Sequence, residues 1–361
     1  MLARHCVYVF IFAALAMVAQ GEGAARAASG DKSKQAEVQA AFARRAMLSA
    51  ARSWGYQLRI GELAPLAAST ADVLVIDHGY AARHLGKTTF EAAEVEGLKT
   101  KADGQRRAVL AYLSIGEAEQ YRFYWQAAWC QRAGAPAWMG AVNPNWPGNY
   151  PVRFWDAGWQ KLILDPVEGY LAKIQAQGFD GVYLDRTDVY GEWGRENRQT
   201  EADMIRFLGA IAEAARAKNS RFLVVMQNAE ELLRHAPVRR VLDGVAKEDL
   251  LHGLKFTEAA NSAADVKSAV ADLQRAKADK IPVFAVEYLA DPVKIAVARK
   301  RLLGLGFVPT FAPRLLDRLP KELLPPDAVA AEEAADEAPT AAAAPASSAG
   351  WGEGGPTCLL D

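Results

Sequence analysis

The feature that most constrains this chain is a short apolar segment that follows a helical stretch and ends in a carboxylate. The clearest copy is Gly178–Asp185, in which a glycine stops the preceding stretch, apolar residues follow and Asp185 comes last. The apolar residues predict a buried strand, and the acid marks the point at which the strand leaves the core. In a parallel α/β barrel, the catalytic side chains come from that end of the strands.

Similar apolar runs recur along the chain and alternate with helical stretches such as Trp159–Gln177, Glu201–Lys218 and Ala263–Lys280. This alternation indicates right-handed βαβ units and a parallel sheet. Eight strands favour a closed (β/α)₈ TIM barrel over an open doubly wound sheet, because the glycine-rich phosphate turn typical of the open sheet is missing after the first run. Asn143–Asp156 is expected to add a small strand. The predicted strands are Tyr56–Arg59, Val73–Asp77, Ala108–Ile115, Gly181–Asp185, Phe222–Asn228, Gly244–Glu248, Pro282–Tyr288 and Phe307–Phe311.

The N-terminus has the pattern of a secretory signal peptide, which we place at residues 1–27. Arg4 gives a positive start, Val7–Val18 is an unbroken apolar run, and Ala25-Arg26-Ala27 has the form of a cleavage site. The apolar run is shorter than the about 20 residues that span a bilayer, so no stable membrane span is expected after cleavage. An uncleaved anchor is the alternative. The predicted location is secreted, periplasmic or extracellular.

The rest of the chain divides by composition into three parts. Residues 28–49 are Ala-rich and polar and form a linker or lead-in helix, and residues 50–318 form the barrel domain. Residues 319–361 form an Ala/Pro-rich acidic low-complexity tail, which is expected to be disordered because it cannot bury enough apolar surface.

Composition excludes several classes of function. The formal net charge is −1, which gives no global attraction to nucleic acid or to a membrane. Three cysteines are too few for a disulfide framework, and pairing of Cys130 with Cys358 is left open. The chain lacks the Cys-x-x-Cys and His-x-x-x-His spacings of common zinc sites, so neither a metal nor another cofactor is expected. We expect a monomer.

Acids or amides stand at or near the ends of most predicted strands. If these side chains converge on one barrel mouth, like charges raise the pKa values of some of them, which keeps a general acid protonated near neutral pH. For members other than Asp185 and Glu248, a helix cap or an ion pair is the alternative role. The set is Asp77, Glu117, Asp185, Asn228, Glu248 and Glu287.

Glycoside hydrolysis is the chemistry that best uses many carboxylates. One carboxylic acid protonates the leaving oxygen, and a second carboxylate either attacks the anomeric carbon or activates a water molecule. A magnesium-dependent hydrolase is the chemical competitor, because hard cations also take oxygen ligands. The region Tyr121–Trp159 is rich in aromatic rings, of which two or three are expected to contact sugar faces while the rest pack. Asp188 could bind a sugar hydroxyl or cap the next helix.

Several motifs together resemble one known family. They are Trp54–Leu58, Tyr112–Trp125, Gly178–Asp185, Gln227–Glu230 and Gly244–Glu248. The family is glycoside hydrolase family 114, and the resemblance to its endo-α-1,4-polygalactosaminidases covers roughly Trp54–Pro313. It implies a secreted barrel with two catalytic carboxylates.

The resemblance places these two carboxylates at Asp185, as nucleophile, and Glu248, as acid/base. It also implies that Asp77, Glu117, Arg122, Tyr124, Asn228 and Glu287 line the cleft, and Trp125 and Asp188 complete the predicted substrate-binding set. Lys247 departs from the expected surroundings of Glu248, although strand alternation predicts that its side chain points away from the cleft.

The sequence therefore predicts a secreted, retaining glycoside hydrolase. The family resemblance implies that it cleaves α-1,4 linkages in a galactosamine-containing exopolysaccharide. The alternatives are a non-catalytic secreted polysaccharide-binding barrel and a metal-dependent hydrolase.

Overall fold

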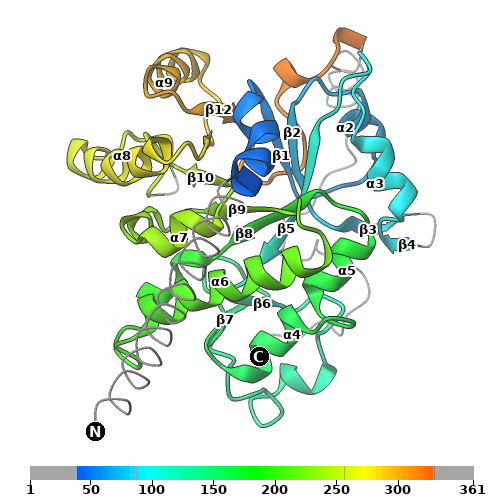
Figure 1. Ribbon diagram of the computed structural model, residues 1–361, viewed down its shortest axis with the longest axis vertical. Helices are drawn as coiled ribbons and strands as arrows, with labels where there is room; N and C mark the ends of the chain where they lie inside the picture. The colour runs from blue at the N-terminus through cyan, green and yellow to red at the C-terminus, as the bar shows by residue number, and fades with distance from the viewer. Residues whose placement is uncertain (1–38, 85–86, 256, 328, 330–361) are drawn as a thin grey trace, which may run out of the picture. The chain divides into compact units, whose positions relative to one another are not determined.

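The computed structural model describes residues 39–84, 87–255, 257–327 and 329, and a compact unit begins at Arg44. Eight parallel strands form one sheet in the order β1-β2-β5-β8-β9-β10-β11-β12 (Figure 1). This arrangement confirms the predicted TIM barrel. The strands are β1 (Trp54–Gln57), β2 (Val73–Ile76), β5 (Ala108–Ser114), β8 (Gly181–Asp185), β9 (Leu223–Gln227), β10 (Gly244–Glu248), β11 (Val283–Glu287) and β12 (Val308–Phe311).

Strands β8 and β10 begin and end at the predicted residues, and the other strands differ from prediction by one or two residues at their ends. The predicted helix Trp159–Gln177 is instead two helices, α4 (Ala157–Leu164) and α5 (Tyr170–Ala176). Pro166 lies between them and cannot continue a helix, because it has no backbone N–H and its ring clashes with the preceding turn.

Alternate side chains of each strand fill the barrel interior, where an aromatic cluster forms the lower core. The rings of Trp54, Tyr56 and Tyr183 pack together, and Phe284 meets Trp54 edge-on with 5.6 Å between centroids. Trp54 also donates its indole N–H to the carbonyl of Val308 at 3.0 Å. This bond joins β1 to β12, the first and last strands of the sheet.

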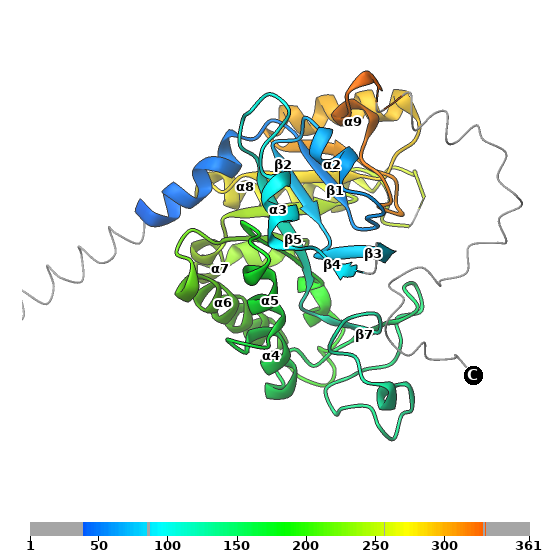
Figure 2. The same ribbon diagram turned by 90° about the vertical axis from the view of Figure 1, so that its right-hand side faces the viewer.

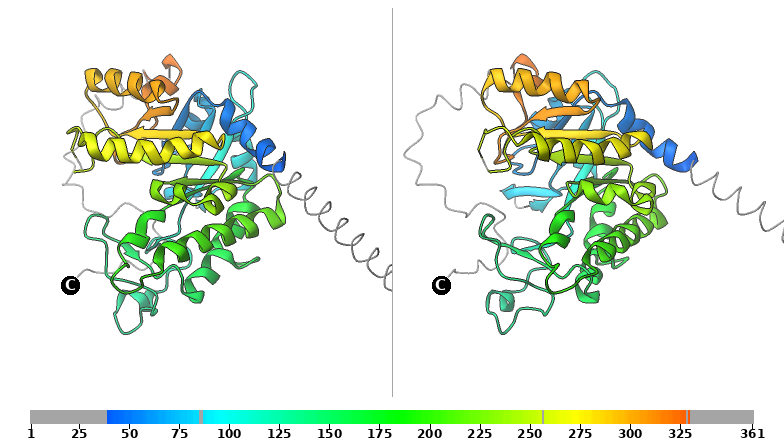
Figure 3. Two further views of the ribbon diagram at one scale, coloured as in Figure 1. Left: turned by 60° about the vertical axis from the view of Figure 1, so that its left-hand side comes forward. Right: turned by 90° about the vertical axis from the view of Figure 1, so that its left-hand side faces the viewer.

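Helices cover the outer face of the strands, and their apolar sides form the larger core with the outward side chains of the sheet. Figure 3 shows α8 and α9 alongside the last strands. Besides α4 and α5, the helices are α2 (Ala64–Ala68), α3 (Ala92–Leu98), α6 (Thr200–Lys218), α7 (Ala236–Val241), α8 (Ala263–Ala278) and α9 (Pro292–Gly304), with 3₁₀ turns η1 (Ala127–Cys130), η2 (Thr187–Gly191), η3 (Glu230–Arg234) and η4 (Lys321–Leu323).

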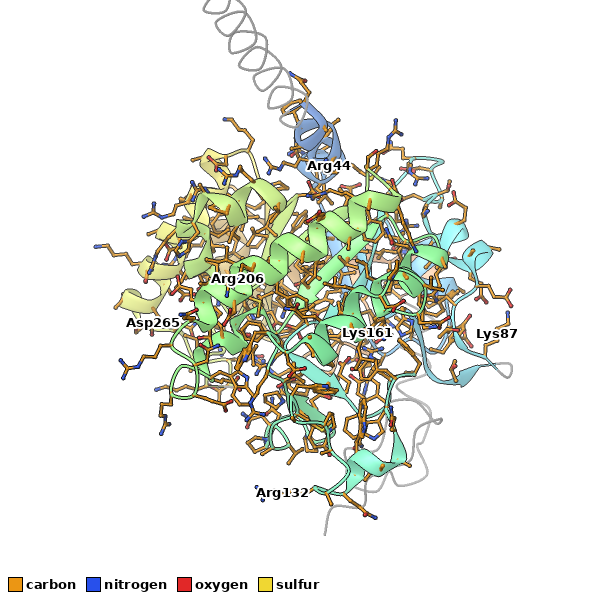
Figure 4. The ribbon with its side chains drawn as sticks, turned by 60° about the horizontal axis from the view of Figure 1, so that its bottom comes forward. Arg44, Lys87, Arg132, Lys161, Arg206 and Asp265 are labelled. Atoms are coloured by element: carbon orange, nitrogen blue, oxygen red, sulfur yellow. The ribbon has the colours of Figure 1, made fainter. Side chains whose placement is uncertain are left out.

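Aspartates at the N-terminal end of the barrel are structural. Asp180 precedes β8 and accepts the backbone N–H of Val109 at 3.0 Å. Asp243 precedes β10, accepts the N–H of Val224 at 3.0 Å and binds Arg44, which is labelled in Figure 4. Acids at this end therefore tie neighbouring strands together, which is the stabilising role expected of the barrel's bottom face.

Two small antiparallel sheets extend the opposite end of the barrel. The first pairs β3 (Gly79–His84) with β4 (Lys87–Thr89), and the second pairs β6 (Glu117–Glu119) with β7 (Asn149–Pro151). Figure 2 shows β3, β4 and β7 on the same side of the barrel strands. The strand expected within Asn143–Asp156 is thus confirmed as β7. The long segment between β6 and β7 carries Arg132 at its outer end (Figure 4).

Ordered packing continues past residue 318. Leu319, Leu323 and Leu324 are buried, and the carbonyl of Leu323 accepts the N–H of Thr70 at 2.8 Å. The predicted signal peptide, residues 1–27, and residues 330–361 of the predicted tail lie outside the described residues. Cys130 is disulfide-bonded, and Cys358 also lies outside the described residues. Among the described residues, no helix is both long and apolar enough to cross a membrane.

Candidate active site

Asp185 and Glu248 are the last residues of β8 and β10, with only β9 between these strands in the sheet. Each of the three strands is followed by a non-glycine residue with a left-handed backbone. The φ values are 58° at Arg186, 56° at Asn228 and 50° at Asp249. Such conformations cost about 1–3 kcal/mol each and cluster at functional sites.

Asp185 points into the barrel mouth because it shares the inward face of β8 with Tyr183 two residues earlier. Its carboxyl is half-buried, and Oδ2 accepts a hydrogen bond of 2.7 Å from the hydroxyl of Tyr112 on neighbouring β5. Burial raises the pKa of Asp185 to about 6, against the opposing effect of the Tyr112 hydrogen bond. A carboxyl with this pKa is mostly ionised at neutral pH.

Glu248 shares the inward face of β10 with Ala246 and is also half-buried. The hydroxyl of Tyr288 donates to Oε1, and Asn228 donates its side-chain amide to Oε2 at 3.3 Å. The backbone N–H of Glu248 donates in return to Asn228 Oδ1 at 3.1 Å, which fixes the orientation of that amide. Burial and the charge of Asp185 raise the pKa of Glu248 to about 7. A carboxyl with this pKa can act as acid and as base near neutral pH.

Asp77 belongs to a buried charge cluster at the end of β2. Arg122 binds Asp77 Oδ1 at 2.8 Å through one guanidinium nitrogen and Glu119 Oε2 at 2.6 Å through another. Burial alone would raise the pKa of Asp77, but Arg122 outweighs it and holds this pKa below its usual range. The predicted residues Asp77 and Arg122 are thus brought together, with Glu119 as a third member.

Glu117 is 1% exposed and pairs with Arg186, the residue after Asp185, at 3.0 Å. Asn143 donates to the same carboxylate at 2.8 Å. Burial raises the pKa of Glu117 to about 7.

Glu287 is fully buried and lies on the outward face of β11, because Phe284 and Val286 point inward. Its two oxygens accept the backbone N–H groups of Leu251 at 2.7 Å and His252 at 3.0 Å. It therefore anchors the loop that follows β10. Burial raises its pKa to about 7.

The remaining predicted residues lie in different surroundings. Tyr124 and Trp125 are buried among aromatic rings, and Tyr124 accepts the backbone N–H of Glu119. Asp188 is exposed in η2 and lies 3.5 Å from Arg186. Among the rings of this region, Trp146 is 43% exposed.

Lys247 pairs with Glu230 at 3.2 Å. Its neighbour Glu248 has Tyr288 and Asn228 as hydrogen-bond partners. The lysine and the glutamate thus have different partners, as strand alternation predicts.

Sequence reasoning missed Tyr112 and Tyr288, the two hydroxyl donors to the acids. Period-two alternation could have found them, since Tyr288 follows the inward residues Phe284 and Val286 at intervals of two, and Tyr112 follows Leu110 in the same way. The pairing of Arg186 with Glu117 had no comparable signal.

In the part of the chain that the structure describes, no group of three or more His, Cys, Asp or Glu side chains is arranged to hold a metal ion.

Comparisons with known proteins agree with this geometry. The sequence profile of glycoside-hydrolase family GH114 matches residues 34–315. An uncharacterized protein of Deinococcus radiodurans is 36% identical over 279 residues, which are 75% of this chain and 83% of the relative. An uncharacterized protein of Methanocaldococcus jannaschii is 34% identical over 283 residues, covering 74% and 77% of the two chains.

Among solved structures, the glycoside hydrolase domain of PelA from Pseudomonas aeruginosa aligns with a TM-score of 0.56 and 22% identity. The alignment covers 74% of this chain and 97% of that domain, and it shows a shared fold. The family match, which spans most of the barrel, shows more: this chain is a glycoside hydrolase and belongs to glycoside-hydrolase family GH114.

Proposed function

We propose that the protein is a secreted, retaining hydrolase of α-1,4 linkages in a galactosamine-containing exopolysaccharide. The observation that carries the proposal is the pair of half-buried, inward-facing carboxyls at the ends of β8 and β10, with pKa values of about 6 for Asp185 and about 7 for Glu248. Two carboxyls with unequal pKa values suit the roles of nucleophile and acid/base.

The proposed reaction has two steps. Asp185 attacks the anomeric carbon with Oδ1, since Oδ2 is held by Tyr112, while Glu248 gives its proton to the departing glycosidic oxygen. Glu248, now ionised, then takes a proton from water, and the resulting hydroxide displaces Asp185 from the anomeric carbon. The configuration is inverted twice and is therefore retained.

Charge supports an amino sugar as the substrate. Amino groups of galactosamine are cationic below their pKa, and they favour an acidic site. Arg122 neutralises only one of its two partners, Asp77 and Glu119, so this cluster keeps a net negative charge beside the mouth.

The first experiment measures cleavage of defined α-1,4-galactosamine oligomers by mass spectrometry. Asp185→Asn and Glu248→Gln should each lower kcat by about 10²–10⁴-fold or more, while Glu213→Gln on the exposed face of α6 should keep wild-type activity. Each variant should keep the wild-type circular dichroism spectrum. Full activity in either site variant would remove that residue from the mechanism.

Two further measurements separate the alternatives. The first-formed product should have the anomeric configuration of the substrate by NMR, whereas the opposite anomer would indicate single-step inversion. Activity should survive a chelator, and its loss with restoration by added cation would favour a metal-dependent hydrolase. Tight binding of the polymer without any cleavage would favour the binding-only alternative.

A further inference from the structure

Glu117, the first residue of β6, connects two parts of the site that are distant in sequence. Its Oε1 lies 3.0 Å from Nε of Arg186 and accepts the amide of Asn143 at 2.8 Å. Its Oε2 lies 3.4 Å from the amide nitrogen of Asn149. Both oxygens thus have protein partners, and only 1% of the residue is exposed.

On one side, this carboxylate is tied to the backbone that carries Asp185. The N–H of Ile115 donates to the carbonyl of Asp185 at 3.1 Å. Gly116 packs so closely that a Cβ there would lie 2.2 Å from the carbonyl oxygen of Arg186. The segment leading to Glu117 therefore touches both the catalytic residue and the left-handed residue after it.

On the other side, Glu117 holds a turn. The N–H of Asn143 donates to the carbonyl of Asn149 at 2.7 Å, and Asn149 donates to the carbonyl of Trp146 at 3.0 Å. The amides of both asparagines reach Glu117, so the turn that presents the exposed Trp146 is anchored on this one carboxylate.

We propose that Glu117 is a positioning residue that contacts no sugar: it fixes Asp185 through Arg186 and fixes the 143–149 turn through two asparagine amides. This inference rests on the proposed function, because it assigns Asp185 the role of nucleophile. It differs from the cleft-lining role that the family resemblance implies for Glu117.

The charges around Arg186 explain why Glu117 matters for position. Arg186 also pairs with the exposed acids Asp188 and Glu192, which pull its guanidinium toward solvent. Glu117 is its buried partner and draws it back toward β6. Without that buried charge, Arg186 and the strand end before it are free to shift, and a displacement of about 1 Å at a reacting group can cost about 10²-fold in rate.

The test is Glu117→Gln, assayed for kcat and KM on the same galactosamine oligomers. The glutamine keeps the size of the side chain but cannot carry the negative charge that Glu117 holds toward Arg186 at pH values above its pKa of about 7. A positioning role predicts that kcat falls about 10- to 100-fold while KM stays within about twofold. Glu192→Gln removes an exposed partner of Arg186 instead and should stay within about twofold of wild type in both constants.

A second variant tests the same link independently, in case Glu117→Gln loses activity only because it misfolds. Arg186→Gln changes a half-buried side chain and should reproduce the loss in kcat. The double variant Glu117→Gln/Arg186→Gln should be no slower than the slower single variant, because both substitutions break the same link.

The outcomes separate this inference from the proposed function. An inactive wild type would overturn the proposed function and this inference with it. If the wild type is active, two results would overturn the inference and leave the proposed function standing. One is that Glu117→Gln raises KM at unchanged kcat. The other is that the effects of the two substitutions on kcat are additive in free energy.

Discussion

The hydroxyl of Tyr112 lies 2.7 Å from Oδ2 of Asp185, across the neighbouring strands β5 and β8. Glu248 has a corresponding partner in Tyr288, which donates to Oε1. Each carboxyl of the proposed catalytic pair is thus stabilised in its ionised form by a tyrosine, and each tyrosine should govern one limb of the pH profile.

Tyr112→Phe removes a hydrogen bond that lowers the pKa of Asp185, so this pKa should rise above about 6. The nucleophile must be ionised, and the acid limb of kcat/KM should therefore move to higher pH. Tyr183→Phe is the matched control, because its hydroxyl is buried on the same inward face and makes no hydrogen bond among the described residues. An acid limb that does not move would contradict the role of Tyr112.

Tyr288→Phe should act on the opposite limb. In the wild type, the hydrogen bond from Tyr288 lowers the pKa of Glu248, so the phenylalanine variant should have a Glu248 pKa above about 7. Since the acid must be protonated to release the leaving oxygen, the basic limb of kcat/KM should extend to higher pH. Full pH profiles of the two phenylalanine variants, measured side by side, check both predictions. A shift of the basic limb to lower pH would reverse the assignment.

Gly116→Ala should disrupt the contact between the end of β5 and Arg186, because the new methyl group would lie 2.2 Å from a carbonyl oxygen. We expect a lower free energy of unfolding, by about 1–3 kcal/mol, together with a loss of kcat. Gly209→Ala on α6 is the control, since nothing lies within 4 Å of its Cβ position. That variant should be more stable than wild type by about 0.5–1 kcal/mol in chemical denaturation.

Glu287→Ala should loosen the loop that follows β10. The N–H groups of Leu251 and His252 would lose their buried acceptor, at a cost of about 1–3 kcal/mol in the free energy of unfolding. Limited proteolysis should then cut within residues 249–261 faster than in wild type. Glu287→Gln keeps one acceptor oxygen and should give an intermediate rate. Equal cleavage rates in all three proteins would argue against this anchoring role.

The fold was largely predictable because apolar runs and helical stretches alternate so regularly. Strands β8 and β10 match their predicted bounds, and these are the strands that end in Asp185 and Glu248. The same alternation places an acid at a strand end without saying on which face it lies. Asp185 and Glu287 both end strands, yet one points into the barrel and the other lies on the outward face beneath a loop.

The rest depended on contacts between distant segments. The burial of Tyr124 and Trp125 follows from the packing of the long segment between β6 and β7. The sequence of this segment has neither the hydrophobic periodicity of a helix nor that of a strand. The link from Glu117 to Arg186 requires a left-handed residue after β8, where the sequence has an arginine rather than the glycine that would signal such a backbone. Propensity rules are thus least informative where the site is assembled.

The left-handed residues after β8, β9 and β10 have an evolutionary consequence. Glycine would relieve the backbone at Arg186, Asn228 and Asp249, yet each of these side chains has a partner near the site. Arg186 pairs with Glu117 and Asn228 binds Glu248, while Asp249 pairs with Arg314, whose guanidinium lies over the ring of Tyr288. Selection for thermal stability alone would favour glycine there, whereas selection for turnover would favour the present residues. Laboratory evolution toward heat resistance without an activity screen should therefore replace these three residues early.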